Sequence, residues 1–414
     1  MKTIAIVGTF DSKGTEYAYV RNIIQGLGVN TVTIHCGVFE PMFVPDISNE
    51  EVAKAAGFDI YEIAAKMDRA LATEILTKGM EKLIPRLYDE GKFDGIISFG
   101  GSGGTAIVTP AMRGLPIGVP KIMVSTVASG NTSQYVGTSD VIMYPSIVDV
   151  AGINSISMKI FTNAAFAIVG MVKFDYTHKF VKKPLIAATM FGVTTPCVNY
   201  AREYLEKEGF EVVIFHATGT GGKTMEDLIA AGFFDGVLDL TTTEWCDELV
   251  GGVLNAGPHR LEAAGRFNIP QVVSTGALDM VNFASIDSVP KEFQGRNLYK
   301  HNPTVTLMRT NIEENRQLGL ILSEKLNQAK SPTALMLPLK GVSMIDVKGQ
   351  PFYGMEEDQM LFSTIREHID RDVVELIEID SNINEQSFAI AAAKKLIELM
   401  NKKQQGGNQN GVNS

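Results

Sequence analysis

The chain has 414 residues, of which 45% are apolar and 20% charged, and its formal net charge at pH 7 is -10. This length predicts two or three domains, and the composition excludes a mainly disordered chain. The negative charge argues against broad nucleic-acid binding, because proteins of that class need a basic face. A local basic pocket is still compatible with a negative net charge.

The cysteines and the apolar segments predict the cellular compartment of the protein. Cys36, Cys197 and Cys246 form no CxxC pair, so we expect a reducing compartment with neither a disulfide framework nor a zinc site. The N-terminus leads directly into a β-type run, unlike a signal peptide, and the apolar stretch 161–172 is too short to span a membrane. We therefore expect a cytoplasmic protein with no membrane or nucleic-acid partner.

In chain order, short β-type runs alternate with helical patterns, which predicts βαβ units and a parallel sheet. The first half begins with a strand at 3–7, a polar loop at 8–14 and a helix from 15 to about 27. A strand at 31–35 precedes a helical insertion over 48–90 with a break near Gly79. Further elements follow: strands at 95–99, 121–124 and 141–144, and a helix at 154–172.

A polar, basic segment at 176–184 marks the expected boundary between two domains, 1–180 and 181–402. The Gln/Asn/Gly-rich tail at 403–414 is expected to be disordered. The second half repeats the first: His35 and His216 stand at corresponding strand ends, and 141–145 matches 305–309. We expect class α/β, two Rossmann-like domains with mainly parallel sheets. Duplication and chance similarity both remain open as the origin of the repeat.

The last elements of the second half leave two arrangements open. Residues 333–338 and a helix at 356–368 are followed by a strand at 372–377 and a helix at 384–400. This last strand and helix either extend the second sheet or cross back to the first domain. The segment 338–353 is expected to form a loop and short hairpin over the site, with a plain surface turn as the alternative.

Glycine-rich loops follow the predicted strands, where parallel sheets bind ligands. Glycines allow backbone N–H groups to approach an anion, and the helix that follows adds unpaired N–H donors. Each loop has an ordinary turn as its alternative. The candidate phosphate-binding residues of the first half are Gly8, Thr9, Asp11, Lys13, Gly100, Gly101, Ser102, Gly103, Gly104, Thr105, Thr126, Ser129, Gly130 and Asn131. Those of the second half are Thr218, Gly219, Gly221, Gly222, Lys223, Thr242, Arg260 and Gly276.

Few side chains suggest chemistry beyond binding. Asp11 and Glu244 are candidate Mg²⁺ ligands, and His216, Glu244 and Asp11 are candidate acids or bases. The GGKT sequence at 221–224 lacks the first glycine of a P-loop, no HExxH occurs, and 100–104 resembles a GxSxG elbow only superficially. The catalytic residues stay unassigned.

Six motifs carry a family resemblance: GTFDSKG, SFGGSGGT, FHATGTGGKTMEDLI, LDLTTTEWCDELVGG, GPHRLEAAG and IPQVVSTGALDMVNF. They resemble the ATP-binding domain family named for the tomato mosaic virus resistance protein, from residue 1 to about 400. The resemblance implies paired Rossmann-like domains, a homodimer or higher homo-oligomer, and ATP with Mg²⁺ at the glycine-rich loops. In the plant protein this region precedes a TIM barrel and blocks viral RNA replication. We expect a stand-alone bacterial-type member without that antiviral role.

Three functional hypotheses follow. The first is an ATP–Mg-binding protein that acts on or senses a small anionic metabolite in an interdomain cleft. The second is an isomerase, lyase or hydrolase that acts on a phosphorylated or carboxylated sugar-like substrate without ATP. The third is a non-catalytic regulatory binding module.

Overall fold

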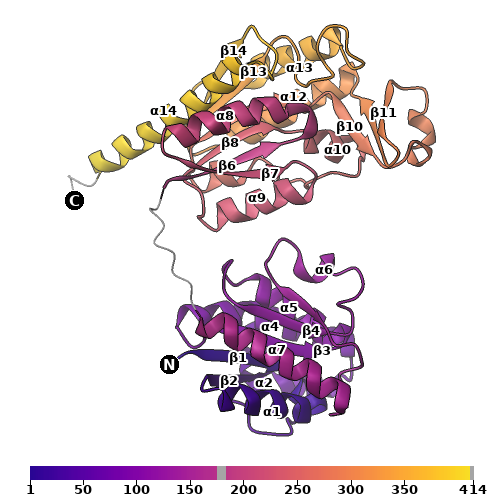
Figure 1. Cartoon of the computed structure of the whole chain (residues 1–414), viewed down its shortest axis with the longest axis vertical. Coiled ribbons are helices and arrows are strands. Elements are labelled where there is room, and N and C mark those ends of the chain that lie inside the picture. The colour runs from indigo at the N-terminus through magenta and orange to yellow at the C-terminus, as the bar shows by residue number, and fades with distance from the viewer. Residues whose placement is uncertain (175–182, 411–414) are drawn as a thin grey trace. The chain divides into compact units, whose positions relative to one another are not determined.

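The computed structural model describes residues 1–174 and 183–410. The chain divides into two compact units, an N-terminal unit (Met1–Lys179) and a C-terminal unit (Phe180–Ser414) (Figure 1). Each unit contains a parallel sheet with helices packed on it, which confirms the expected α/β class. The expected boundary after residue 180 lies outside the described residues.

The sheet of the N-terminal unit has five parallel strands in the order β2-β1-β3-β4-β5. The strands are β1 (Thr3–Gly8), β2 (Asn30–His35), β3 (Gly95–Gly100), β4 (Lys121–Ser125) and β5 (Ile142–Pro145). In β1 the side chains alternate: Ile4 and Ile6 pack with helices α1 (Phe10–Gly26) and α7 (Ser155–Lys173), while Ala5 and Val7 join the opposite core. This alternation buries both faces of the sheet.

Helix α7 is, within 1–174 and 183–410, the one helix that is long and apolar enough to cross a membrane by length and composition. Its Phe161, Ala164 and Ile168 side chains are fully buried in the core that also contains Ile4 and Ile6 of β1. Helix α7 is therefore placed as a core helix of the N-terminal unit.

The opposite face of this sheet is covered by α5 (Ser102–Arg113) and by an insertion of three helices between β2 and β3. These are α2 (Asn49–Ala56), α3 (Ile60–Ala65) and α4 (Arg69–Asp89); a short α6 (Ser133–Val136) follows β4. The predicted break near Gly79 was wrong, because α4 runs through it. A Cβ atom at Gly79 would lie 2.1 Å from the Val52 carbonyl oxygen, so this glycine permits α2 and α4 to approach closely. The helices are interrupted at 66–68 instead.

The C-terminal unit repeats this strand order. Its sheet runs β14-β13-β9-β8-β6-β7, in which β7-β6-β8-β9-β13 corresponds to β2-β1-β3-β4-β5. The strands are β6 (Leu185–Met190), β7 (Glu211–His216), β8 (Gly236–Thr241), β9 (Gln271–Gly276), β13 (Thr333–Pro338) and β14 (Val374–Ile379). The shared order supports one plan for both units. Strand β14 pairs in parallel with β13, so the last strand extends the second sheet.

The predicted match of 305–309 with 141–145 was wrong. These residues form β12 (Val305–Arg309), which lies antiparallel between β10 (Met280–Phe283) and β11 (Leu298–Asn302) in a separate sheet. Their apolar alternation suits either sheet equally well, so the pattern could not distinguish the two. Strand β13 takes the fifth place.

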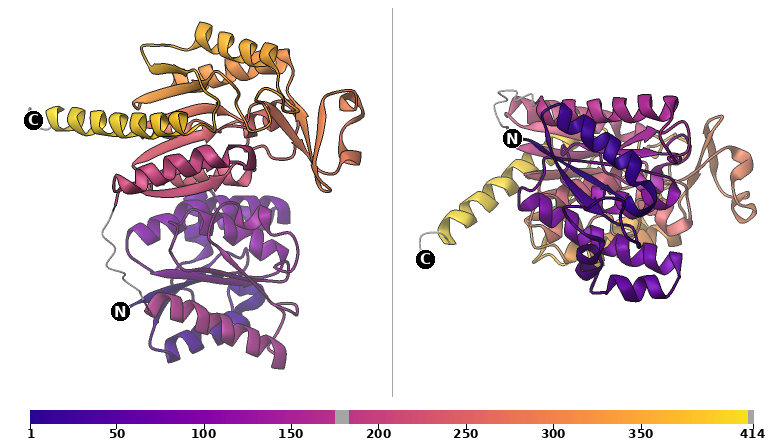
Figure 2. Two further views of the ribbon diagram at one scale, coloured as in Figure 1. Left: turned by 45° about the horizontal axis from the view of Figure 1, so that its top comes forward. Right: turned by 90° about the horizontal axis from the view of Figure 1, so that it is seen from below.

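The helices of the C-terminal unit cover both sheet faces. They are α8 (Thr195–Lys207), α9 (Thr220–Ala230), α10 (Glu244–Val250), α11 (Ala263–Arg266), α12 (Ile312–Asn327), α13 (Met355–His368) and α14 (Gln386–Asn410), with 3-10 turns at Gly192–Thr194, Ile286–Ser288 and Lys291–Phe293. Helix α14 runs on past the sheet (Figure 2) and extends into the segment expected to be disordered. Residues 411–414 lie outside the described residues.

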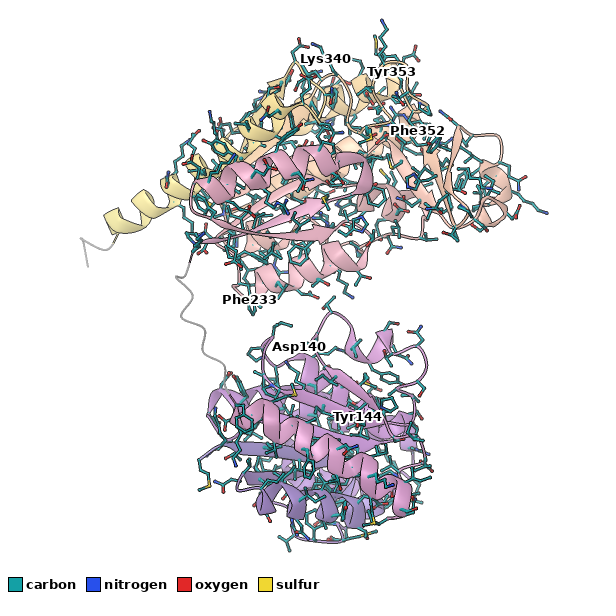
Figure 3. The ribbon with its side chains drawn as sticks, viewed as in Figure 1. Asp140, Tyr144, Phe233, Lys340, Phe352 and Tyr353 are labelled. Carbon is teal, nitrogen blue, oxygen red and sulfur yellow. The ribbon has the colours of Figure 1, made fainter. Side chains whose placement is uncertain are left out.

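The segment 339–353 forms a loop without strands, so the predicted hairpin was wrong. Phe352 is completely buried and its ring lies edge-on to Tyr299 of β11, with 6.2 Å between ring centroids (Figure 3). The loop is therefore anchored to the small antiparallel sheet by packing.

Candidate functional site

A cavity of about 630 Å³ lies at the carboxyl ends of β1, β2 and β3 in the N-terminal unit. This edge of a parallel sheet is where ligands bind in such folds, and the volume lies in the range of small-molecule sites. Its lining combines the loop after β1, the glycine-rich loop after β3 and the α3–α4 corner. The predicted residues that line it are Thr9, Asp11, Lys13, Gly101, Ser102, Gly103 and Gly104.

The N-terminus of α5 provides unpaired hydrogen-bond donors to this cavity. Gly101 precedes the helix in extended conformation, and no side chain caps it. The first helical bond joins the Thr105 N–H group to the Gly101 carbonyl at 3.0 Å. Within the described residues, the N–H groups of Ser102, Gly103 and Gly104 have no acceptor. We call these three groups the N-terminal nest; such donors, at the positive end of a helix, attract anions.

Arg69 lies beside the N-terminal nest. Its Nη2 atom is 3.3 Å from the position that a Cβ atom would take at Gly103, and its side chain has no acceptor within 1–174 and 183–410. Arg69 is exposed, and an anion that lies between its guanidinium and the positive end of the helix would be attracted by both. The arrangement therefore fits a phosphate or carboxylate that both groups would contact.

The first turn of α1, which follows β1 after one residue, contributes charges of both signs. Lys13 interrupts the first turn of α1 with φ -134° and ψ 25°, and its ammonium group donates to the Val150 carbonyl. Asp11 accepts a hydrogen bond from the Phe39 N–H group at 3.1 Å. Gly37 makes space for it, because a Cβ atom there would lie 2.5 Å from the carboxylate oxygens of Asp11.

Apolar side chains from the helical insertion form the rest of the cavity. Ile63, Leu76 and Ile107 are buried along it, whereas Phe39 and Met67 line it while remaining 59% and 81% exposed. The cavity lining thus combines groups suited to an anion with apolar side chains. This combination is typical of sites for nucleotides and other amphipathic ligands.

The groups that line the cavity do not form a nucleophilic catalytic site. Burial raises the pKa of the Cys36 thiol to about 12, which keeps it neutral and unreactive at pH 7. Ser102 is absent from the residues with positive φ, so it lacks the strained turn of a nucleophile elbow. No histidine is among the described residues that line the cavity.

Two predicted residues of the N-terminal unit outside the cavity lining, Gly8 and Thr105, make packing contacts. A Cβ atom at Gly8 would lie 2.0 Å from the Tyr17 ring, so this glycine makes room for an aromatic side chain. Thr105 is buried, and its hydroxyl lies 2.7 Å from that of Ser125. The predicted residues outside the cavity lining are Gly8, Gly100, Thr105, Thr126, Ser129, Gly130 and Asn131.

The glycine-rich loop of the C-terminal unit is already occupied. The N–H groups of Gly219 and Gly222, which we call the C-terminal nest, donate to Oε1 of Glu244 at 2.7 and 3.0 Å. Arg260 donates from Nε to the other carboxylate oxygen at 2.7 Å. Glu244 is 1% exposed. Both of its carboxylate oxygens thus accept from protein donors, and its role as a Mg²⁺ ligand, acid or base stays a prediction.

Arg260 is likewise an internal residue. Besides Glu244, its guanidinium contacts both carboxylate oxygens of Asp239 at 2.5 and 2.7 Å and Glu226 at 3.3 Å. Burial by itself lowers the pKa of Arg260, but the three carboxylates outweigh it and raise the pKa well above its ordinary value. These contacts leave Arg260 1% exposed, and its binding of a ligand phosphate stays a prediction.

The remaining predicted residues of the C-terminal unit divide between packing and surface. A Cβ atom would lie 1.9 Å from the His216 carbonyl oxygen at Gly221 and 2.0 Å from that of Leu240 at Gly276, so both glycines permit close backbone approach. Thr242 is buried and donates to the Ser274 carbonyl at 3.0 Å. The predicted residues with exposed or half-buried side chains are His216, Thr218 and Lys223.

Sequence reasoning missed Arg69, Phe39, Met67 and Asp149, all of which line the cavity. Arg69 is the first residue of α4, directly after the capping residue Asp68, whose carboxylate accepts from Ala70 and Leu71 N–H groups at 2.9 and 3.0 Å. An Asp followed by a helical pattern is a start signal, so it could have located this corner.

Metal ligands are sparse. Within the described residues, no group of three or more His, Cys, Asp or Glu side chains could hold a metal ion. Asp11 is the predicted Mg²⁺ ligand that lines the cavity. A metal there would need further ligands from a bound molecule.

Comparison with known proteins identifies relatives of the whole described chain. Residues 2–177 match the family described as "Uncharacterised protein family (UPF0261) N-terminal domain", and residues 183–400 match its C-terminal domain. A "UPF0261 protein" of Clostridium tetani is 56% identical over 402 residues, which cover 97% of this chain and 100% of that protein.

The tomato protein is also similar to this chain in sequence identity. The "ToMV resistance protein Tm-1(GCR237)" of Solanum lycopersicum is 44% identical over 339 residues, which cover 80% of this chain but 45% of the tomato protein. More than half of the tomato protein thus has no counterpart in this match.

Solved structures with a similar arrangement are distant. A UDP-GlcNAc 2-epimerase of Methanocaldococcus jannaschii has 10% identity and a TM-score of 0.22, covering 66% of this chain and 83% of that one. The glycosyltransferase SsfS6 of Streptomyces sp. SF2575 has 12% identity and a TM-score of 0.18, covering 66% and 82%. Similarity at this level carries no information about a ligand.

Proposed function

The chain belongs to the uncharacterised protein family UPF0261, and on that premise we propose that its N-terminal unit binds a phosphorylated small molecule, ATP or a related nucleotide. The observation that carries the proposal is the N-terminal nest with Arg69 beside it and no protein anion between them. The C-terminal nest, which has a similar set of donors, is filled by the Glu244 carboxylate. A ligand anion would take the corresponding place in the N-terminal unit.

The proposed phosphate position uses three kinds of donor. The nest supplies backbone N–H groups at the helix N-terminus, Arg69 supplies a planar guanidinium, and Lys13 adds a positive charge from the first turn of α1. A hydrogen bond to a charged group contributes about 1.5–3 kcal/mol. Arg69 alone would therefore account for roughly a 10- to 150-fold gain in affinity.

Mg²⁺ enters the proposal as a companion of the nucleotide. This ion commonly binds through one or two carboxylates together with substrate phosphates, rather than in a cage built by the protein. Asp11 is the carboxylate we assign to it, since Asp11 lines the cavity from the first turn of α1. Binding is the function proposed here; a second, anionic metabolite and a homo-oligomeric state remain predictions from the sequence.

Isothermal titration calorimetry with ATP–Mg²⁺ tests this function. We expect Arg69→Ala to weaken binding by roughly 10- to 150-fold because it removes the charged donor beside the nest. Arg86→Ala is the matched control: it lies on the same helix, is exposed, and contacts Glu90 at 3.6 Å. Its affinity should equal that of the unaltered protein. Equal binding by Arg69→Ala, or no binding of any nucleotide by the unaltered protein, would refute the proposal.

A further inference from the structure

We propose that Phe39 and Met67 form a clamp for a planar, apolar group of the ligand, so that the ligand joins an aromatic ring system to its phosphate. This inference rests on the proposed function, since it assigns a role to further lining residues of the same cavity. Both side chains line that cavity, and they come from separate segments, the loop after β2 and the α3–α4 corner.

The backbone of Phe39 is fixed although its ring is exposed. Its N–H group donates to Asp11 Oδ2 at 3.1 Å, and its carbonyl oxygen lies 2.9 Å from Nε2 of His35. The His35 ring is completely buried, and its Nδ1 accepts from the Phe10 N–H group at 3.0 Å, which assigns the proton to Nε2. The Phe39 ring, 59% exposed, is thus presented at the cavity by an ordered backbone.

Met67 is presented in a comparable way from a strained turn. Its φ is +51°, in the left-handed region that a side chain with a Cβ atom disfavours. Its N–H group donates to the Ala64 carbonyl at 3.2 Å, and the next residue, Asp68, caps α4. The turn therefore stays in place while the side chain remains 81% exposed. Strain of this kind occurs at ligand clamps.

Isolated exposed apolar residues are common on protein surfaces and carry no argument by themselves. Here the two exposed side chains line the same cavity as the buried residues Ile63, Leu76 and Ile107 and as the glycines of the N-terminal nest. An aromatic ring and a thioether both make favourable contacts with a flat π-system. The chemistry that fits is a nucleotide, with its base against Phe39 and Met67.

Stacking of this kind tolerates different bases, because every base has a π-face. We therefore expect similar affinities for ATP and GTP. A ligand with the same phosphates but no ring, inorganic tripolyphosphate, would use the nest and Arg69 without the clamp. The comparison of nucleotide with tripolyphosphate isolates the clamp from the proposed phosphate site.

The experiment measures binding of ATP–Mg²⁺, GTP–Mg²⁺ and tripolyphosphate–Mg²⁺ to Phe39→Ala and Met67→Gly by calorimetry. Glycine suits the φ of position 67, so this variant removes the side chain without disturbing the turn. We expect each variant to weaken nucleotide binding by roughly 5- to 150-fold, the usual effect of losing one stacking side chain, and to leave tripolyphosphate binding unchanged. Val44→Ala, on the same loop as Phe39, 90% exposed and outside the cavity lining, should change neither.

Two results would overturn the clamp while the phosphate site stands. One is nucleotide binding that both variants leave unchanged; the other is an equal loss of nucleotide and tripolyphosphate binding in both. If the unaltered protein binds neither ligand, the proposed function fails and the clamp fails with it. A more than 30-fold preference for one purine base would also contradict a site that recognises its ligand by stacking alone.

Discussion

The two glycine-rich nests of this protein have similar donors and different occupants. In the C-terminal unit, Gly219, Gly222 and Arg260 surround the carboxylate of Glu244. In the N-terminal unit, residues 102–104 and Arg69 surround no protein acceptor in the described chain. The difference teaches that a glycine-rich loop at a helix N-terminus indicates an anion, which the protein itself can supply.

A second difference accompanies the first. The N-terminal unit has three helices, α2, α3 and α4, between β2 and β3. The C-terminal unit has one helix, α9, between the corresponding strands β7 and β8. The extra helices supply Ile63, Met67, Arg69 and Leu76 to the cavity. The insertion thus builds an apolar wall and a free guanidinium where the other unit has a closed ion-pair cluster.

The largest expected effect comes from emptying the C-terminal nest. Glu244→Ala leaves two buried glycine N–H groups and part of the Arg260 guanidinium without partners, and breaking a buried ion pair costs about 3–5 kcal/mol. We expect the free energy of unfolding of this unit to fall by that amount. Fluorescence in a denaturant titration reports it, because Trp245, the single tryptophan, is buried next to Glu244 in the sequence.

Glu248→Ala is the control for this measurement. Glu248 lies on the same helix, is half-buried, and has no hydrogen bond or ion pair in the described chain. A surface change of this type alters stability by about 0.5 kcal/mol or less. If Glu244→Ala unfolds at the same denaturant concentration as Glu248→Ala, the C-terminal nest does not depend on its carboxylate.

The same substitution in both nests should separate folding from binding. A Cβ atom at Gly222 would lie 2.0 Å from Glu244 Oε2, so Gly222→Ala should destabilise the C-terminal unit by about 1–3 kcal/mol through overpacking. At Gly103 the nearest atom is the mobile end of Arg69, at 3.3 Å, so Gly103→Ala should leave stability within about 0.5 kcal/mol.

For ATP–Mg²⁺ affinity we expect the reverse: Gly103→Ala should have the larger effect and Gly222→Ala the smaller. The methyl group of Gly103→Ala would occupy the space between the N-terminal nest and Arg69, so ATP–Mg²⁺ affinity should drop several-fold in calorimetry. Gly222→Ala, while folded, should bind as the unaltered protein does. The reverse assignment of the two effects would show that the C-terminal nest is the ligand site.

A smaller effect is expected from pH. The carboxyl groups with a clearly raised pKa in the described chain lie in the C-terminal unit; burial raises that of Asp247 from 3.8 to about 7, despite hydrogen bonds from Asn282. The unfolded chain therefore releases this proton first. The associated stability is complete below pH 4 and is lost as the pH rises from about 4 to about 7.

Denaturant titrations across this pH range, read by Trp245 fluorescence, test the linkage. Asp247→Asn removes the titrating group, so the loss of stability between pH 4 and pH 7 should shrink by the amount that Asp247 contributes. An unchanged pH profile in this variant would mean that another group causes the dependence.

Local patterns were enough to predict the parallel sheets and the loops that approach an anion. An apolar run such as Ile4–Val7 favours a strand, and glycines such as those at 100–104 let the backbone approach an anion. Both effects depend on residues within a few positions of each other. The occupant of each nest depends instead on tertiary contacts: Glu244 lies 25 residues from Gly219 and 22 from Gly222. No spacing rule connects a carboxylate to amides at such separations.

The α3–α4 corner escaped prediction for a related reason. Met67 takes a left-handed turn that glycine or asparagine would normally mark, so the chain shows no break there. Gly79, which does resemble a break, serves the contact with Val52 within a continuous helix. Glycine can occupy a position because the chain turns there or because a neighbouring segment lies too close for a side chain. Only the tertiary packing distinguishes these two cases.

Hydrogen exchange of the backbone amides in the two nests tests the central claim most directly. Without ligand, the account predicts rapid exchange at residues 102–104 and strong protection at Gly219 and Gly222, whose N–H groups already bind Glu244. Saturating ATP–Mg²⁺ should protect residues 102–104 and leave the C-terminal nest unchanged. Protection of 102–104 in the absence of ligand, or a ligand response at Gly219 and Gly222 instead, would contradict it.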